Sequence, residues 1–182
     1  EMCIRDSTGT GAELKEALET DPGSAASGTS AIVTDAVTVS VANSIAGASN
    51  VTAAFTNGIA DSLSNLASGG NATSGLTTAA GDDTNVNITI SDSTTTMTAA
   101  DLSAVTGSTT GTVTLTNAQT ITGTGAQVKA ALITDAVTLG AASNATVSDG
   151  VSAADAAAIA GTTNVTAAFT TGISDTLANL LN

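Results

Sequence analysis

The sequence contains almost none of the side chains on which most enzyme sites depend. It has no histidine, tryptophan or tyrosine, and only 2 phenylalanines and 1 proline in 182 residues. Histidine is the commonest general base and the commonest metal ligand, so its absence removes most acid–base and zinc chemistry. Without tryptophan or tyrosine, the chain also lacks the aromatic platforms that usually hold a sugar beside a pair of catalytic carboxylates. We therefore expect no enzyme activity and no catalytic or cofactor-binding residues.

Basic residues are also scarce. Three lysines and arginines stand against 16 aspartates and glutamates, which gives a net charge of −13 at pH 7. Such a charge repels phosphate backbones, so the sequence argues against a nucleic-acid partner. The same charge keeps a long chain soluble and attracts cations. No apolar run approaches the ~20 residues needed to cross a bilayer, so we expect no membrane span.

The first seven residues, EMCIRDS, resemble the translated adapter that is used to build shotgun sequencing libraries. We therefore predict that residues 1–7 are an adapter-derived artefact, and we exclude them from reasoning about the fold. This exclusion removes Arg5 and the only cysteine, Cys3. The sequence then predicts no disulfide, no thiol nucleophile and no cysteine metal site. We also expect both ends to be truncated.

What the sequence does contain is a long repeat. NVTAAFTNGIADSLSNL at 50–66 returns as NVTAAFTTGISDTLANL at 164–180, 114 residues further on. The alignment extends from 8–68 to 122–182 without a gap, and about half of the paired positions are identical. Such self-similarity is the signature of a repeat array. We predict a first 114-residue block at 8–121 and a partial second block at 122–182.

A shorter period lies inside each block and is marked by expected helix starts. Four hydroxyl residues are followed three positions later by an acid or amide, as in a capping box. These pairs are Thr10 and Glu13, Thr98 and Asp101, Thr124 and Gln127, and Ser152 and Asp155. Apolar residues at helical spacing follow in both blocks. They include Leu14, Ala17 and Leu18, matched by Val128, Ala131 and Leu132, and also Ile59, Leu63 and Leu66, matched by Ile173, Leu177 and Leu180.

Between the helices, apolar and polar residues alternate as in half-buried strands. NVNITI (85–90), TVTLTN (112–117) and NVTAAF (50–55, and again from 164) show this pattern. In the last of these, Val51, Ala53 and Phe55 are expected to point inward. The Gly/Ser/Thr-rich stretch SGGNATSGLTTAAGDD (68–83) is expected to be a surface loop.

Each helix-and-strand unit spans roughly 23–37 residues, which is below the ~40 at which a chain usually folds without staples. Such units are stable only when neighbours stack and make one continuous core. Alternating helices and strands favour parallel strands with right-handed crossovers. We therefore predict an α/β repeat solenoid of short helix–strand units with a parallel sheet. A parallel β-helix, or β-solenoid, is the alternative.

Three stretches carry a resemblance to a known class of protein. They are ISDSTTTMTAADLSAVTGSTTGTVTLTN (90–117), VSDGVSAADAAAIAGTTNVTAAF (147–169) and GISDTLANLL (172–181). They resemble the Thr/Ala/Asp-rich repeat arrays of large secreted bacterial surface proteins, which are adhesin-like or lie beside haemolysin-type (RTX) calcium blocks. The resemblance covers nearly all of 8–182 and implies export, acidity and no cysteine. The calcium-binding GGxGxD nonapeptide of RTX blocks does not occur in this sequence, so calcium rolls are not implied.

Two groups of acids are candidate cation sites. Asp83 begins the spacing of an EF-hand loop, but the loop lacks the required glycine and glutamate, which leaves Asp82 and Asp83 as weak calcium candidates. Five Ser/Thr–Asp pairs recur at unit junctions, and they are either turn and cap formers or a carboxylate ladder that bridges cations. The pairs are Thr34–Asp35, Ser91–Asp92, Thr134–Asp135, Ser148–Asp149 and Ser174–Asp175.

The functional expectation is structural. The sequence predicts a repeat segment of a large secreted or cell-surface bacterial protein that acts as a spacer or display scaffold for adhesion or surface assembly. The alternative is a calcium- or glycan-binding repeat module. The expected partners are neighbouring repeats of the same chain and cell-surface or matrix components, and the expected location is extracellular or at the cell surface.

Overall fold

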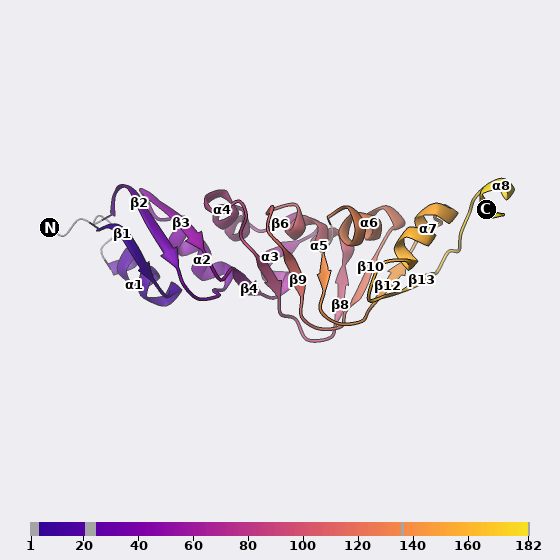
Figure 1. Ribbon diagram of the computed structural model, residues 1–182, viewed down its shortest axis with the longest axis horizontal. Coiled ribbons are helices and arrows are strands. Elements are labelled where there is room, and N and C mark those ends of the chain that lie inside the picture. The colour runs from indigo at the N-terminus through magenta and orange to yellow at the C-terminus, as the bar shows by residue number, and fades with distance from the viewer. Residues whose placement is uncertain (1–3, 21–24, 136, 182) are drawn as a thin grey trace.

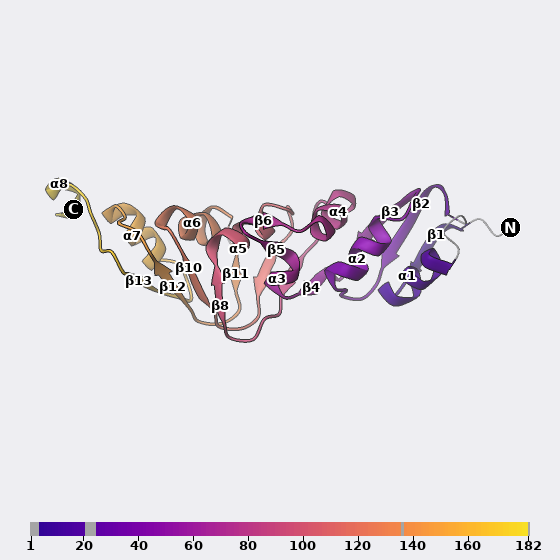
Figure 2. The same ribbon diagram turned by 180° about the vertical axis from the view of Figure 1, so that it is seen from behind.

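The protein is described by a computed structural model that covers residues 4–20, 25–135 and 137–181. It is a mixed α/β chain in which the strands of the three larger sheets run parallel, as expected from the sequence. Figure 1 shows that the elements follow one another along the long axis, with the two termini at opposite ends. The view from behind shows the same succession (Figure 2). Cys3 and the side chain of Arg5 lie outside the described part.

The first sheet has the order β1-β2-β3 and lies at the N-terminal end (Figure 1). Its strands are β1 (Ile4–Gly9), β2 (Ala25–Val33) and β3 (Val51–Phe55). The inward residues of β3 are Val51, Ala53 and Phe55, and all three are buried, as predicted. β1 begins inside 1–7, and the assignment of those residues to an adapter stays a prediction.

Two four-stranded sheets occupy the rest of the chain. One has the order β4-β7-β9-β11, with β4 (Ile59–Asp61), β7 (Ile88–Ile90), β9 (Val113–Leu115) and β11 (Thr138–Leu139). The other has the order β8-β10-β12-β13, with β8 (Thr96–Thr98), β10 (Thr120–Gly123), β12 (Ser143–Val147) and β13 (Val165–Phe169). In the first of these sheets Thr89, Thr114 and Thr138 lie side by side in register. Such cross-strand threonine pairs suit an exposed strand face.

All four predicted helix starts are confirmed. The helices concerned are α1 (Gly11–Thr20), α5 (Ala99–Thr106), α6 (Gly125–Lys129) and α7 (Ala153–Ala160). Full capping boxes form at Thr10 and at Thr124, where the hydroxyl accepts from the third helical N–H and the acid or amide reaches back. At Thr98 and Ser152 the hydroxyl accepts from the third helical N–H in the same way, and at Thr98 the hydroxyl also donates to the carboxylate of Asp101. A π-helical turn, η1 (Ala130–Thr134), continues α6.

The predicted surface loop at 68–83 is wrong. It holds a two-stranded hairpin, β5 (Ala67–Ser68) and β6 (Asn71–Ala72), and then the helix α4 (Ser74–Asp82). Gly69 and Gly70 both have positive φ and form the two-residue turn, a conformation that glycine adopts without strain. Thr73 caps α4, whose Leu76, Ala79 and Ala80 are buried. The Gly/Ser/Thr-rich composition favoured a loop, although the apolar residues of this stretch have helical spacing at i, i+3 and i+4.

The helix predicted from Ile59 to Leu66 is shorter than expected. Ile59 lies in β4, and only α3 (Leu63–Leu66) is helical. The second copy behaves in the same way, since α8 (Leu177–Leu180) begins four residues after Ile173. Apolar spacing alone could not separate a strand residue that packs inward from the first turn of a helix. Ala17, expected inside, is exposed, although its neighbours Leu14 and Leu18 are buried.

The remaining helix is α2 (Val39–Ala46). The valine just before it makes a contact that recurs in the second block. This valine is Val37, and a Cβ added to Gly11 would lie 2.2 Å from one of its methyl carbons. In the second block a Cβ added to Gly125 would lie 2.1 Å from the same methyl of Val151. No real Cβ tolerates such a distance, so both blocks need glycine where a helix start touches the following segment. One buried cluster of apolar residues, mostly valine, isoleucine, leucine and alanine, runs through the chain.

Candidate functional site

The described residues contain no group of three or more histidine, cysteine, aspartate or glutamate side chains placed to hold a metal ion. Within the same residues, no helix is both long enough and apolar enough to cross a membrane. One surface hollow of about 340 Å³ is bordered by Leu63, Met97, Asp92 and Asp101. The arrangement that repeats along the chain is instead a set of aspartate hydrogen bonds between one unit and the next.

In five places, an aspartate carboxylate accepts a hydrogen bond from the backbone N–H of the first residue of an earlier helix. The pairs are Asp35 with Gly11 (2.7 Å), Asp61 with Val39 (3.0 Å), Asp92 with Leu63 (2.6 Å), Asp149 with Gly125 (2.7 Å) and Asp175 with Ala153 (3.0 Å). The two residues of a pair are 22 to 29 positions apart, which is about one unit. We call these five bonds the aspartate ladder.

The ladder satisfies groups that a helix cannot satisfy itself. The first N–H groups of a helix have no partner within it, and the helix dipole places partial positive charge there. In α2, α6 and α7 a hydroxyl at the N-cap takes an N–H further inside the first turn. The aspartate of the ladder accepts a hydrogen bond from the first N–H of the helix, which the hydroxyl does not reach. In these three helices, an aspartate 22 to 24 residues later in the sequence therefore completes the cap.

The Ser/Thr–Asp pairs thus serve mainly as caps, one of the two alternatives left open by the sequence. Four of the five pairs belong to the ladder, and they cap the helix of the preceding unit. The exception is Asp135, which accepts from the hydroxyl of Ser103. Pattern reading missed Asp61, because it follows Ala60 and not a serine or threonine.

Asp61 is the most enclosed member of the ladder, with 9% of its surface exposed. It also accepts from the N–H of Ser62 at 2.8 Å and from the side-chain amide of Asn65 at 2.7 Å. Asp175, its counterpart in the second block, repeats all three bonds, with Ala153, Thr176 and Asn179 as donors. The same short sequence therefore builds the same three-donor cradle twice.

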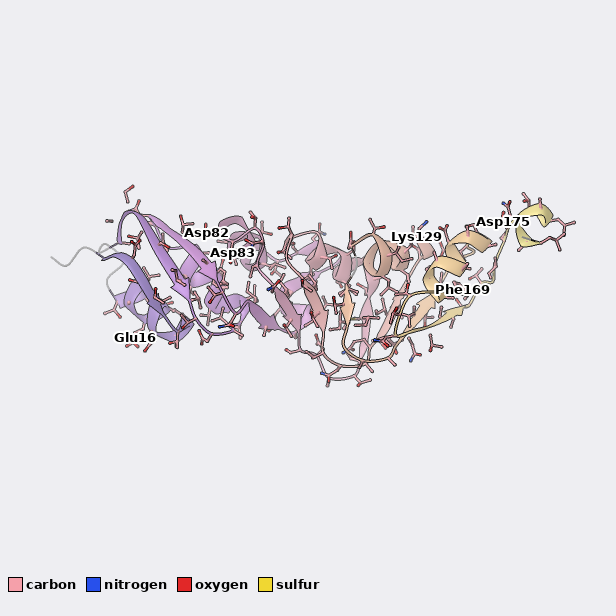
Figure 3. All side chains as sticks on the ribbon, in the orientation of Figure 1. Glu16, Asp82, Asp83, Lys129, Phe169 and Asp175 are labelled. Atoms are coloured by element: carbon pink, nitrogen blue, oxygen red, sulfur yellow. The ribbon has the colours of Figure 1, made fainter. Side chains whose placement is uncertain are left out.

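The two calcium candidates lie at the C-terminal end of α4, beside the first sheet (Figure 3). Asp82 accepts from the N–H of Ala53 and Asp83 from the N–H of Phe55, each at 2.8 Å. These two N–H groups belong to β3, the last strand of that sheet, and have no further strand to pair with. The acids therefore close a sheet edge, and their assignment to calcium stays a prediction.

Replacing either acid tests these roles. We expect Asp82→Ala and Asp83→Ala each to lower the free energy of unfolding by about 1–2 kcal/mol, because a charged acceptor is lost from a strand amide. The loss should be the same in chelator and in millimolar calcium when urea unfolding is followed by circular dichroism. Glu16, exposed on α1 (Figure 3), is the matched control, and Glu16→Ala should have almost no effect. A loss that appears only with calcium would instead support a calcium site.

Three carboxyl groups have lowered pKa values, each with a local cause. The pKa of Asp175 lies below its ordinary value because the amide of Asn179 and the N–H groups of Thr176 and Ala153 donate to it. Lys129 donates to Asp155 and lowers the pKa of that carboxyl, with help from Ser152. The N–H and hydroxyl of Thr10 lower the pKa of Glu13.

These shifts predict a loss of stability in acid. A carboxyl whose folded pKa is below its unfolded pKa stabilises the fold above the unfolded value, and loses that contribution as pH falls through the folded value. We therefore expect a constant melting temperature from neutral pH to about 5, and a fall below about 4. Carbon NMR titration should place the midpoints of Asp155 and Asp175 below 3.8, the ordinary value. Lys129→Met should raise the midpoint of Asp155 and leave that of Asp175 unchanged.

Comparison of the chain with known protein families, with curated proteins and with solved structures found no match.

Proposed function

We propose that this chain is a segment of an α/β repeat solenoid and acts as a spacer or display scaffold in a large secreted or cell-surface bacterial protein. The observation that carries the proposal is the aspartate ladder, in which the helix cap of one unit is completed by the next unit. A unit with such a cap is favoured only beside its successor. Chains built in this way gain length by adding units and form no deep pocket.

Charge and composition support the same role. A net charge of −13 keeps neighbouring copies apart and a long chain soluble. Small residues let helices and sheets approach closely, so the units stay slim. The resemblance to Thr/Ala/Asp-rich arrays points to an extracellular or cell-surface location. The partners would be the adjoining repeats and cell-surface or matrix components.

Small-angle X-ray scattering tests the scaffold directly. A tandem chain, in which 8–121 occurs twice before 122–182, should have the same cross-sectional radius as the original chain. Its maximum dimension should increase by the length of one block. A tandem chain that is no longer than the original, or that is thicker, would contradict the scaffold.

A further inference from the structure

Identical side chains are buried in the first block and exposed in the second. Ile59 has 1% of its surface exposed and Leu66 has 0%, whereas their counterparts Ile173 and Leu180 have 48% and 51%. The contrast between Leu63, at 6%, and Leu177, at 72%, is larger still. Local sequence cannot cause these differences, because it is nearly the same in both places.

The covering of the first copy is known in detail. The helix α4 packs on α2 and β3, β7 pairs with β4, and α5 contacts α3. These elements belong to residues 69–106, which we call the covering segment. It contributes Leu76, Ala79, Ile88 and Ile90 to the core.

The covering segment also supplies three carboxylates to backbone N–H groups of the surface that it covers. Asp82 and Asp83 accept from β3, and Asp92 accepts from the first residue of α3. In the second copy the corresponding donors are Ala167, Phe169 and Leu177. Within the described part of the chain, these three amides face no carboxylate.

The uncovered surface in the second block is formed by α7, β13 and α8. It has a hollow of about 380 Å³ lined by apolar residues, namely Ala153, Ala156, Ala157, Ala160, Phe169, Ile173 and Leu180. Figure 3 places Phe169 and Asp175 at this C-terminal end. The alanines of α7 are suited to a closely packed helix: on α2 the matching contact is made by Gly75 of α4, where a Cβ would lie 3.5 Å from Val39 and Asn43.

We propose that the surface formed by α7, β13 and α8 is a docking surface for one further unit of this repeat, joined to the same polypeptide and carrying the pattern of the covering segment. The recognition chemistry is specific. The occupant needs an apolar helix that ends in two adjacent aspartates. It then needs a short apolar strand for the segment at Ile173, and a third aspartate for the N–H of Leu177. The inference rests on the proposed scaffold. It adds the features that a unit must have in order to bind the exposed end of that scaffold.

The test is a chain extended after Asn182 by a copy of 69–121, the residues that follow the matching position in the first block. Amide hydrogen exchange should show strong protection of Ala167, Phe169 and Leu177 in the extended chain, compared with the original chain. The matched control carries Asp82→Ala, Asp83→Ala and Asp92→Ala in the appended copy only. It should lose most of the protection at these three amides, while protection in the first block stays unchanged.

Two outcomes would overturn the inference. In the first, the extended chain is longer by scattering but the three amides stay unprotected, so the scaffold would stand and the docking surface would fail. In the second, sedimentation shows that the original chain dimerises and that the dimer protects the same amides, so the occupant would be a second copy. Failure of the scaffold itself would be seen separately, as a tandem chain that does not lengthen.

Discussion

We expect Asp61→Ala to lower the free energy of unfolding by about 3 kcal/mol. The carboxylate is almost fully enclosed and accepts from three donors, namely the N–H groups of Val39 and Ser62 and the amide of Asn65. Removing it leaves the buried N–H of Val39 and two part-buried donors without their charged acceptor, and an unsatisfied buried group costs about 1–3 kcal/mol. Because the chain has no tryptophan or tyrosine, urea unfolding should be followed by far-ultraviolet circular dichroism.

The second block provides the control. Asp175 makes the same three bonds but is less enclosed, because no counterpart of the covering segment packs on it within the described residues. Water can replace the carboxylate there, so Asp175→Ala should cost clearly less than Asp61→Ala. Equal losses would mean that the enclosure of Asp61 contributes nothing, and that the ladder is only a set of exposed caps.

The parts of the structure that depend on neighbours in sequence were predictable. The hydroxyls of Thr10, Thr98, Thr124 and Ser152 cap helices because their partners are three residues away. The strand predicted at 85–90 was recognisable from its alternation, although only Ile88–Ile90 is a strand. Parallel strands followed from the succession of helix and strand, since a parallel pair needs a crossover connection.

The parts that depend on distant partners were not predictable. Asp61 looked like any acid in a turn, because its helix donor lies 22 residues earlier. Asp82 and Asp83 resembled a failed calcium loop, whereas their partners are the amides of β3. A pattern of residue types gives no information about which strand edge a carboxylate will meet.

The burial of single residues shows most directly that a sequence pattern does not predict distant contacts. Ile59 and Ile173 occur in nearly identical sequences, yet one is enclosed and the other half exposed. Hydrophobic spacing indicates which face of an element turns inward. It does not indicate whether a neighbouring element is present to cover that face, and that neighbour decides how much apolar area each residue buries.

The largest expected effect is that of Phe55→Ala, which should lower the free energy of unfolding by about 4 kcal/mol, the usual cost of removing a buried phenylalanine. Phe55 is 3% exposed between the first sheet and the helices beside it. Phe169→Ala makes the same change in the same VTAAF sequence, where the ring is only partly buried. It should cost about 1–2 kcal/mol, in proportion to the smaller apolar area that is removed from water.

Extension of the chain turns this pair into a test of neighbour-dependent burial. When a copy of 69–121 follows Asn182, Phe169 should become enclosed, and the cost of Phe169→Ala should rise toward that of Phe55→Ala. The cost of Phe55→Ala should not change, because its surroundings are the same in both chains. If the cost of Phe169→Ala stayed constant in an extended chain that is folded throughout, the burial of VTAAF would be a property of the segment itself. The stability of a unit would then not depend on the unit that follows it.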